Sequence, residues 1–389
     1  MGKLLLVSPT PTHPTNAGNR SRIRKWLEVC VEEGVDFHLA FFRDEPGDEA
    51  AMARCWGEDR CTFLDYLRPR RSFQQRLSLR LARAFHGHRV WPHHIDDWRR
   101  ESLVNNLRDL AKRIKPSCAQ VEYAFFSHLF NCFDKSVFRI LDTHDIIAGR
   151  DRMFLKVGRG PEWFYTTERQ EAIGLNRADC IVAIQDQDRA YFKELTRKPV
   201  VTVGHMVELR APTMPCTGQP TAVFMGSANA VNQDAVGFLL EKIWPAVKKS
   251  VPDANLEVYG RVCAHATNCV PGVRLVGEVA DVCQAYERAW LVLCPLRLGT
   301  GLKIKSIEAL GQGKALVSTT SGCTGIENGE GKAFLRGDLA DDFARHCINV
   351  LADRKLRHSL ELGACQYATA WNVAQRSNLV GVLASAGLR

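Results

Sequence analysis

Residues 295–326 of the chain read PLRLGTGLKIKSIEALGQGKALVSTTSGCTGI, and this stretch decides the fold. The apolar run at 291–293, just before it, predicts a short strand that leads into a Gly-rich turn at 299–301. A helical pattern follows the turn, and residues 315–317 predict a second short strand. A strand, a tight turn, a helix and another strand in this order are typical of an α/β domain with a parallel sheet.

The turn and the start of the helix together suit a phosphate group. Glycines let the backbone approach a ligand closely, and the N-terminus of a helix presents unpaired N–H groups to an anion. Lys303 and Lys305 follow the turn and add positive charge for phosphate. Glu308 comes one to two helical turns later, where a carboxylate can accept hydrogen bonds from ribose hydroxyls. We therefore expect a diphosphate over this helix start.

The rest of the second half repeats the α/β alternation. Strands are predicted at 222–225, 256–259 and 273–275, with helices at 232–250 and 282–289. Each strand ends in a short turn that offers backbone N–H groups or charge to a ligand. These turns contain Gly226 and Ser227, then Gly260 and Arg261, and then Gly277, Glu278 and Val279.

The first half has the same alternation. Strands are predicted at 3–7, 35–42, 119–123, 138–142, 179–184 and 200–203, and helices at 21–33 and 161–178. The long loop after the first strand contains Asn16, Gly18, Asn19 and Arg20. Residues 204–220 are rich in Pro, Gly and Thr, which predicts a linker between two domains. The fold class is therefore α/β, with two doubly wound domains at 1–205 and 206–371.

The 295–326 stretch resembles the donor-binding motif of retaining GT-B glycosyltransferases of family 4, the glycosyl transferases group 1. Their signature is a pair of glutamates, E-x7-E. Glu308 occupies the second position and Thr300 the first, so the chain has a GTGxKxK variant of the motif. The resemblance implies two Rossmann-like domains facing an interdomain cleft. It also implies that 1–205 is the acceptor-side domain, completed by a C-terminal crossover helix at 372–389, and that 206–371 binds the donor.

The resemblance assigns roles to residues throughout the chain. It implies catalytic roles for His144, Arg261, Lys303 and Glu308. It implies donor binding by Gly18, Gly226, Ser227, Glu278, Val279, Gly299, Thr300, Gly301 and Lys305, and acceptor-side roles for Asn16, Asn19, Arg20 and Asp145. His144 follows a strand, as does the sugar-contacting histidine of the family. The turn GSANAVNQ lacks the Arg and Lys that many members use to grip the diphosphate, so Arg261, Lys303 and Lys305 are expected to supply that charge.

No metal and no cofactor is expected, because GT-B enzymes generally work without a metal; the nucleotide-diphosphate sugar is a co-substrate. The triplet Asp186–Gln187–Asp188 resembles a metal-binding D-x-D motif. We interpret it instead as the start of a helix, where acidic residues cap the chain and favour the helix dipole.

The composition of the chain indicates in which cellular compartment it works and which partners it binds. The 14 cysteines are scattered with no CxxC pair, which indicates free thiols in a reducing cytosol. We expect no signal peptide, because the apolar run near the N-terminus is too short, and no transmembrane helix, because no apolar stretch is long enough. Part of the net charge of +9 comes from a basic segment at 68–89. This segment suits peripheral contact with anionic lipid on the inner face of the cytoplasmic membrane, or it is a solvated helix. Nucleic acid is not expected, because no recognition motif accompanies the charge.

The expected function is transfer of a sugar from a nucleotide sugar to an acceptor hydroxyl with retention of anomeric configuration. The acceptor would be a glycan, a lipid-linked molecule or a protein. The expected role is in the biosynthesis of a bacterial surface polysaccharide or lipopolysaccharide. Glycosylation of a surface-appendage protein is one alternative. A non-catalytic GT-B partner subunit and a GT-B-fold nucleotide-sugar epimerase are the others.

Overall fold

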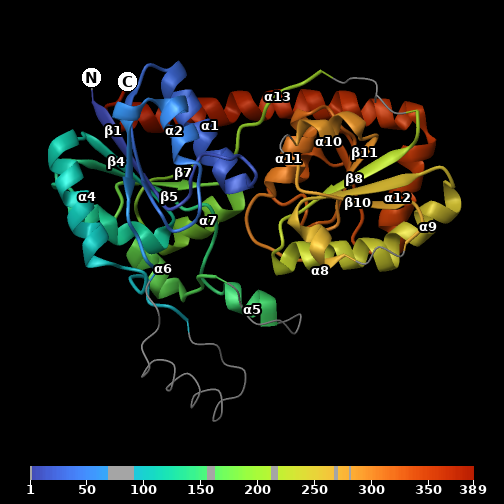
Figure 1. The fold of residues 1–389 in the computed structure, drawn as a ribbon, viewed down its shortest axis with the longest axis horizontal. Helices are drawn as coiled ribbons and strands as arrows, with labels where there is room; N and C mark the ends of the chain where they lie inside the picture. The colour runs from blue at the N-terminus through green and yellow to red at the C-terminus, as the bar shows by residue number, and fades with distance from the viewer. Residues whose placement is uncertain (1, 69–91, 156–162, 212–217, 267–269, 280–281) are drawn as a thin grey trace, which may run out of the picture. The chain divides into compact units, whose positions relative to one another are not determined.

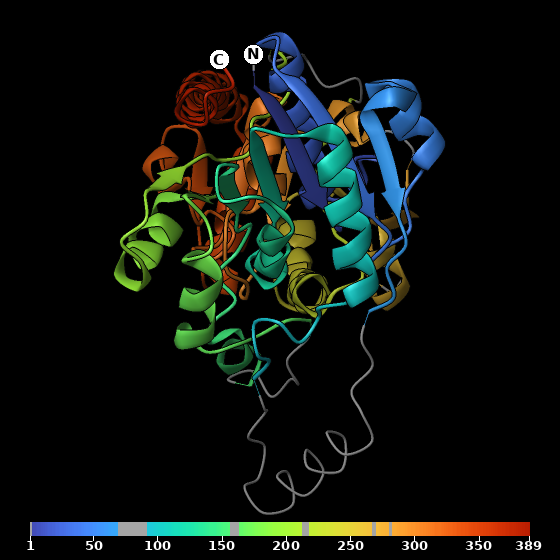
Figure 2. The same cartoon turned by 90° about the vertical axis from the view of Figure 1, so that its left-hand side faces the viewer.

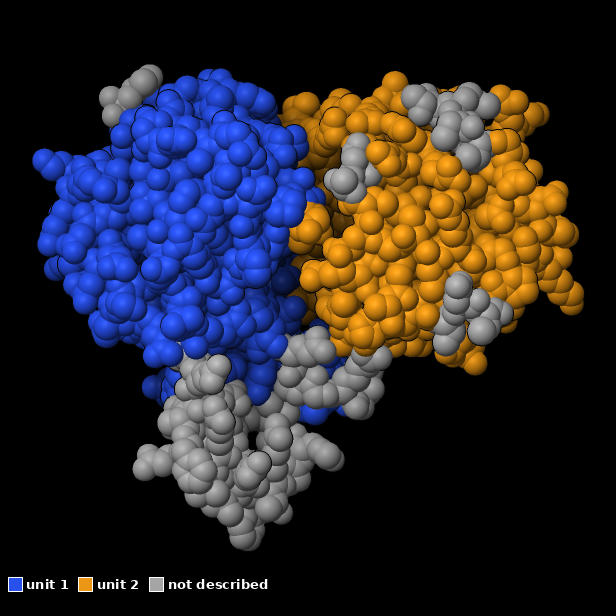
Figure 3. Space-filling model, viewed as in Figure 1, with its two compact units in different colours: residues 1–15, 19–204, 376–389 blue, residues 16–18, 205–375 orange. Residues whose placement is uncertain are grey.

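The computed structural model describes residues 2–68, 92–155, 163–211, 218–266, 270–279 and 282–389. It divides into two compact units, coloured separately in Figure 3. Unit 1 comprises residues 1–15, 19–204 and 376–389, and unit 2 comprises 16–18 and 205–375. The boundary between Gly204 and His205 falls at the start of the predicted linker, of which 212–217 lie outside the described residues.

Unit 1 is built on a parallel sheet with the strand order β3-β2-β1-β4-β5-β6-β7 (Figure 1). Its strands are β1 (Lys3–Ser8), β2 (Asp36–Phe42), β3 (Cys61–Leu64), β4 (Cys118–Glu122), β5 (Phe138–Asp142), β6 (Cys180–Ala183) and β7 (Val200–Thr202). Leu6 of β1 is paired with Leu39 of β2 on one side and with Gln120 of β4 on the other. Because helices cover both faces of such a sheet, its central strands are almost continuously apolar, and Leu4 to Val7 are fully buried.

Helices and 3₁₀ turns connect these strands. They are α1 (Gly18–Glu32), α2 (Glu49–Trp56), η1 (Glu58–Arg60), α4 (Glu101–Ile114), η2 (Ala124–Cys132), α5 (Arg150–Leu155), α6 (Glu168–Leu175) and α7 (Asp186–Leu195). Figure 2 turns this unit toward the viewer, with α4 in front of the strands. Leu103, Val104 and Leu107 of α4 are buried in the same core as Phe126 of η2. The spacing of these three apolar residues gives α4 one apolar face, which explains its position over the sheet.

Unit 2 has a second parallel sheet with the order β10-β9-β8-β11-β12-β13. Its strands are β8 (Thr221–Met225), β9 (Asn255–Tyr259), β10 (Val273–Gly277), β11 (Leu291–Cys294), β12 (Leu316–Ser318) and β13 (Phe334–Arg336). Its connections are α8 (Ala230–Phe238), a π-helical turn η3 (Leu239–Ile243), α9 (Trp244–Ser250), η4 (Arg261–His265), α10 (Cys283–Arg288), α11 (Ile304–Gly311), η5 (Glu327–Gly329) and α12 (Ala340–Ala352). Trp244, Phe224 and Phe343 are fully buried in the core of this unit.

The last helix, α13 (Arg354–Ser385), contributes residues to both units. Asp353 caps its start, because Oδ1 accepts the N–H groups of Lys355 and Leu356 at 2.8 and 3.1 Å. Gly363 is required inside the helix, since a Cβ there would collide with the carbonyl oxygen of Lys332. In the part of the chain that the structure describes, no helix has both the length and the apolar character needed to cross a membrane.

The predicted α/β fold is confirmed, but several predicted boundaries are wrong. The helix predicted at 161–178 begins only at Glu168, because Thr167 caps it with a side-chain bond to the N–H of Gln170 and Trp163 has a left-handed backbone with φ +63°. The first helix starts at Gly18 instead of Ser21. The C-terminal crossover helix expected at 372–389 is the second half of α13, and residues 376–389 belong to unit 1. The basic segment predicted at 68–89 lies outside the described residues except for Arg68, which pairs with Asp44.

Candidate active site

The strand order of unit 2 identifies where a ligand would bind. Strand β8 lies between β9 and β11, so the chain runs outward from β8 in one direction through β9 and β10, and then in the other through β11 to β13. In open α/β sheets, ligands bind at this topological switch point, outside the carboxyl ends of the two central strands. The turn after β8 contains Gly226 and Ser227, and the turn after β11 contains Gly299 to Gly301. The Gly-rich turn of the predicted donor motif therefore lies at this edge of the sheet.

The turn after β11 is shaped by two glycines with left-handed backbone. Gly299 has φ +116° and Gly301 has φ +71°, conformations that side chains rarely adopt. The amine of Lys303 donates to the carbonyl oxygens of Thr300 and Gly301, both at 2.7 Å, and so closes the turn. Helix α11 begins directly afterwards and has no side-chain cap. Its first N–H groups therefore remain suited to an anion.

Thr300 stands where the family signature has its first glutamate. Its hydroxyl oxygen is buried and has no hydrogen-bond partner among the described residues. Buried hydroxyl groups are normally hydrogen-bonded, so an unpaired one next to a ligand-binding turn is a group that a substrate atom can satisfy. This placement suits a contact with the donor, although a hydroxyl cannot supply the negative charge of a glutamate.

The turn after β8 is tied to the same place by Lys305. Its amine donates to the carbonyl oxygen of Met225 and to Oδ1 of Asn232, both at 2.7 Å. Asn232 in turn donates to the hydroxyl of Ser227 at 3.0 Å. Burial lowers the pKa of Lys305, because the charged amine loses hydration. Lys305 therefore links the start of α11 to the end of β8, and Asn232, which the sequence analysis did not single out, belongs to the same group of contacts.

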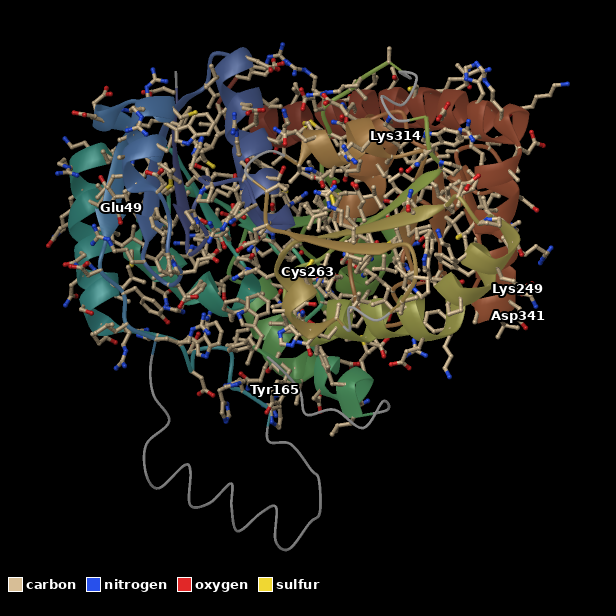
Figure 4. All side chains as sticks on the ribbon, turned by 45° about the vertical axis from the view of Figure 1, so that its right-hand side comes forward. Glu49, Tyr165, Lys249, Cys263, Lys314 and Asp341 are labelled. Carbon is tan, nitrogen blue, oxygen red and sulfur yellow. The ribbon has the colours of Figure 1, made fainter. Side chains whose placement is uncertain are left out.

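Arg261 lies after β9 and remains open to solvent. Its side chain is 61% exposed, and Nε lies 3.7 Å from a carboxylate oxygen of Glu278, which follows β10. The preceding Gly260 has φ +91°, and a Cβ there would collide with the carbonyl oxygen of Gly226. In the same 3₁₀ turn, Cys263 (labelled in Figure 4) donates its thiol to the carbonyl of Val258 at 3.1 Å. The turn therefore holds Arg261 beside the end of β8.

Glu308 lies on α11 and is about one-third exposed. Its Oε1 is 3.6 Å from Nε2 of His205, a residue that is 1% exposed at the side chain. The backbone carbonyl of His205 accepts a hydrogen bond from Trp371 at 2.8 Å. The predicted linker therefore begins with a buried histidine that faces the predicted ribose-binding carboxylate. Tyr286 is buried nearby, and desolvation followed by the charge of Glu308 raises the pKa of its phenol. Its hydroxyl has no hydrogen-bond partner among the described side chains and backbone.

Unit 1 has an equivalent switch point between β1 and β4. Asn19 lies in the first turn of α1 and donates through Nδ2 to the hydroxyl of Tyr123, which follows β4, at 3.1 Å. It also donates to the hydroxyl of Thr10 at 3.3 Å. Arg20 points elsewhere: it is buried and donates to Glu45 and to the carbonyl of Pro46. Sequence reasoning missed Tyr123, whose position at a strand end was the available signal.

His144 follows β5 and lies in a buried group of polar side chains. Its Nε2 is 2.5 Å from Oε2 of Glu122, and its ring stacks on Tyr123 with a centroid distance of 4.1 Å. Glu122, Asp142 and His144 offer ligand atoms within 4.8 Å of one another, as a metal site would. However, Arg22 donates to both oxygens of Asp142, at 2.9 and 3.0 Å, and His144 bonds to Glu122. The three groups therefore have partners within the protein, and their arrangement does not favour a cation.

Asp145 and the loop that follows are also fixed from within unit 1. The carboxylate of Asp145 lies 3.5 Å from Arg150. Glu171 of α6 is fully buried and accepts the N–H groups of Ile147 and Ala148 at 2.9 and 3.2 Å. Burial raises the pKa of Glu171 to about 7, although those two N–H groups oppose the shift. A carboxyl with a raised pKa therefore supports the loop that carries His144 and Asp145.

The remaining predicted residues have simpler positions. Asn16 and Gly18 are grouped with unit 2, and a Cβ on Gly18 would come within 2.9 Å of Cδ1 of Ile304, so glycine allows a close approach to the start of α11. Asp186 and Asp188 lie in the first turn of α7, which confirms the helix start predicted there. Asp186 accepts a hydrogen bond from the hydroxyl of Thr202 at 2.6 Å.

A known protein family and several solved structures are similar to this chain. Residues 219–353, which include nearly all of the second sheet, match the model of the family described as glycosyl transferases group 1. The chain is a glycosyltransferase. No curated protein sequence matches it. Solved structures with the same fold are nevertheless found over nearly its whole length.

Three such structures illustrate the likeness. Sucrose-phosphate synthase from Thermosynechococcus elongatus has a TM-score of 0.68 at 13% identity, with 99% of each chain covered. HepE from Anabaena, solved in complex with UDP and glucose, has a TM-score of 0.69 at 12% identity, with 99% of this chain and 100% of that chain covered. The pneumococcal O-GlcNAc transferase GtfA, in complex with UDP and GlcNAc, has a TM-score of 0.68 at 9% identity, with 99% of each covered. At these identities the likeness establishes the GT-B fold of this glycosyltransferase.

Proposed function

We propose that this glycosyltransferase is a retaining enzyme of family 4 that takes its sugar from a nucleoside diphosphate donor. The observation that carries the proposal is the position of the GTGLKIKSIE segment. It lies at the switch point of unit 2, where Lys305 of α11 donates to the carbonyl of Met225 at the end of β8. A glycine turn, an uncapped helix start and two lysines at this edge suit a diphosphate.

The donor would be held by groups of three kinds. The backbone of Gly299 to Gly301 and the start of α11 would receive the diphosphate, with positive charge from Lys303, Lys305 and the exposed Arg261. Glu308 would accept hydrogen bonds from the ribose, and the backbone at Glu278 and Val279 would border the base. Gly18, Gly226 and Ser227 would allow the backbone to lie close to the phosphates. We propose that this protein charge takes the place of a metal ion in stabilising the leaving diphosphate.

We further propose that retention occurs by front-face displacement. The acidic residue of the first signature position is replaced by Thr300, which is not a carboxylate nucleophile. The acceptor hydroxyl would then attack on the face from which the diphosphate leaves. One oxygen of the leaving diphosphate would take the acceptor proton, and the protein would supply positioning and charge. His144, Asp145, Asn16 and Asn19 would serve the sugar and acceptor side, whereas Arg20, which bonds to Glu45, would not.

The acceptor we propose is a bacterial surface glycan, carried on a lipid or growing as a polysaccharide. Among the solved structures of this fold, the one of S. aureus TarM contains UDP and α-GlcNAc-glycerol, which is compatible with such an acceptor. GtfA of pneumococcus is an O-GlcNAc transferase, so a surface-appendage protein is the second candidate. The described cysteines are all free, which supports work in the reducing cytoplasm.

Isothermal titration calorimetry would test the donor site. The protein would be titrated with UDP, GDP, ADP, CMP and dTDP, each with and without a chelator. We expect one nucleoside diphosphate to bind with the same affinity in both conditions, and the variant Glu308→Ala to lose turnover with the matching nucleotide sugar. Binding of none of them would contradict the proposed donor site, and binding that the chelator abolishes would contradict a metal-independent one.

A further inference from the structure

Glu122 and His144 form the shortest polar contact of the unit 1 site, and neither the family signature nor the proposed mechanism uses Glu122. The two residues end neighbouring strands: Glu122 is paired with Asp142 in the β4–β5 register, and His144 lies two residues beyond Asp142. Their side chains are 1% and 5% exposed, and Nε2 and Oε2 are 2.5 Å apart. A charged hydrogen bond buried to this degree restricts the ring strongly.

The hydrogen bonds of Glu122 define which proton the ring carries. Its Oε1 accepts the side-chain amide of Gln120 at 2.7 Å, and its Oε2 faces Nε2 of His144. When Glu122 is ionised, both of its oxygens accept, and Nε2 of His144 then carries the N–H. In a neutral imidazole the other nitrogen, Nδ1, is then a hydrogen-bond acceptor. Nδ1 has no hydrogen-bond partner among the described residues, so it is the nitrogen available to a substrate.

The two other carboxylates near the ring have cationic partners of their own. The carboxylate of Asp142 is held by Arg22 and that of Asp145 by Arg150, so neither competes for the ring nitrogen. Tyr123 covers one face of the imidazole with nearly parallel rings. Burial, followed by the charge of Asp142, raises the pKa of Glu122, while the bond from His144 opposes that shift. The imidazole is therefore fixed by Glu122 at one edge and by Tyr123 on one face.

The backbone conformation shows that this placement costs conformational free energy. His144 has φ +61° and Tyr123 has φ +68°, both in the left-handed region that non-glycine residues rarely occupy. Such conformations cost about 1–3 kcal/mol each and persist where surrounding contacts enforce them. Here they bring two rings from neighbouring strand ends into stacking contact.

We propose that Glu122 is a positioning residue for the transfer: it holds His144 in the Nε2–H form so that Nδ1 accepts a hydrogen bond from a substrate hydroxyl. This inference rests on the proposed function, because it concerns the side of that site where the family places the transferred sugar. The hydroxyl belongs either to the transferred sugar or to the acceptor, since both present the same O–H donor. The reaction steps themselves are unchanged, as Glu122 acts through His144.

The first test requires a folded protein but not an active enzyme. The chain has 12 histidines, and long-range ¹H–¹⁵N NMR of protein labelled on its histidine rings would report the tautomer of each. The spectrum of His144→Gln identifies the His144 signals by their loss. We expect an unprotonated Nδ1 and a protonated Nε2 at neutral pH. A proton found on Nδ1 would overturn the proposal while leaving the donor site untouched.

The second test is kinetic and uses Glu122→Gln, which keeps the shape of the side chain and removes its charge. We expect kcat to fall at least about tenfold, as for the loss of one charged hydrogen bond, while the affinity for the free nucleoside diphosphate stays the same. The KM that rises identifies the source of the hydroxyl: that of the nucleotide sugar if it belongs to the transferred sugar, and that of the acceptor otherwise.

A matched control separates this role from a general effect of core charge. Glu257 of β9 is also a buried carboxylate and accepts from Arg288 and Tyr259. Glu257→Gln therefore removes a comparable charge from the other unit, and we expect it to lower the unfolding temperature without the change in kcat. A wild-type kcat for Glu122→Gln, or an equal fall in both variants, would contradict a positioning role for Glu122.

Discussion

The amine of Lys305 lies 2.7 Å from the carbonyl oxygen of Met225 and 2.7 Å from Oδ1 of Asn232. Lys305 belongs to the turn-and-helix segment after β11, whereas Met225 ends β8. The contact therefore joins the two strand ends between which the sheet order reverses. It also places a positive charge at the point where a diphosphate is proposed to bind, next to the ring of Phe224 at 5.0 Å.

Replacing this amine should weaken both the fold and the donor site. In Lys305→Met the carbonyl of Met225 and the side chain of Asn232 lose their partner, which we expect to cost about 1–3 kcal/mol of unfolding free energy. We also expect the affinity for the nucleoside diphosphate to fall about tenfold, the equivalent of about 1.4 kcal/mol. Thermal unfolding and calorimetric titration measure the two effects.

Lys248 offers the matched control for Lys305. Its amine also donates to a backbone carbonyl, that of Ala254 at 2.8 Å, but it lies on α9, outside the motif. We expect Lys248→Met to lower stability without changing nucleotide affinity. Equal nucleotide affinity in the two variants would show that Lys305 has a structural role alone.

The fold was predictable because it depends on local patterns. The apolar strands, the glycine turns and the helix containing Glu308 each follow from a few neighbouring residues, and the structure has them close to the predicted positions. The sheet order places Gly226 and Gly299 at one edge, as the α/β alternation implies. By contrast, the prediction of a helix at 161–178 did not take account of Thr167, the single polar residue that caps the helix.

The side-chain partners in the candidate site were not predictable in the same way. The pairing of Glu122 with His144 depends on β4 and β5 being neighbours in register, which no local pattern of the chain specifies. The directions of Lys303 and Lys305 depend on the left-handed glycines before them. His205 lies in a segment whose composition indicated an exposed linker, yet its side chain is buried beside Glu308 of α11, and its backbone carbonyl accepts a hydrogen bond from Trp371 of α13.

The contact between His205 and Glu308 predicts a role for His205 in donor affinity. His205→Phe keeps a buried ring but removes the nitrogen that lies 3.6 Å from Oε1 of Glu308. We expect donor affinity to fall by about two- to tenfold, because the carboxylate loses a partner that orients it. Trp371→Phe is the control, since it removes only the bond to the backbone carbonyl of His205. It should lower the unfolding temperature, and equal affinities in both variants would contradict the role.

The left-handed turn makes Gly299 sensitive to a single methyl group. At φ +116°, Gly299→Ala is strained, and its Cβ would lie 3.2 Å from Cε of Lys303. We expect a loss of about 1–3 kcal/mol in unfolding free energy together with weaker nucleotide binding. Gly237→Ala on α8 is the matched control, since its Cβ would meet no atom within 4 Å, and it should stabilise the protein by about 0.5–1 kcal/mol. Unchanged nucleotide binding in Gly299→Ala would remove this turn from the donor site.

Glu171 predicts a specific dependence of stability on pH. Burial raises its pKa in the folded protein from the ordinary glutamate value of about 4.5 to about 7, so between these pH values the folded state retains a proton that the unfolded state has released. The corresponding stability is complete below about pH 4.5 and is lost as the pH rises through about 7. At about 1.4 kcal/mol for each pKa unit, the loss approaches about 3 kcal/mol by pH 8.

Glu171→Gln carries an uncharged side chain at every pH, and denaturant unfolding from pH 5 to pH 8 should show it gaining on the wild type by that amount. Glu168→Gln changes another acid of the same helix, one exposed to solvent, and its curve should run parallel to that of the wild type. A Glu171→Gln curve that also runs parallel would mean that the buried carboxyl does not titrate in this range, and that its bonds to Ile147 and Ala148 keep it ionised.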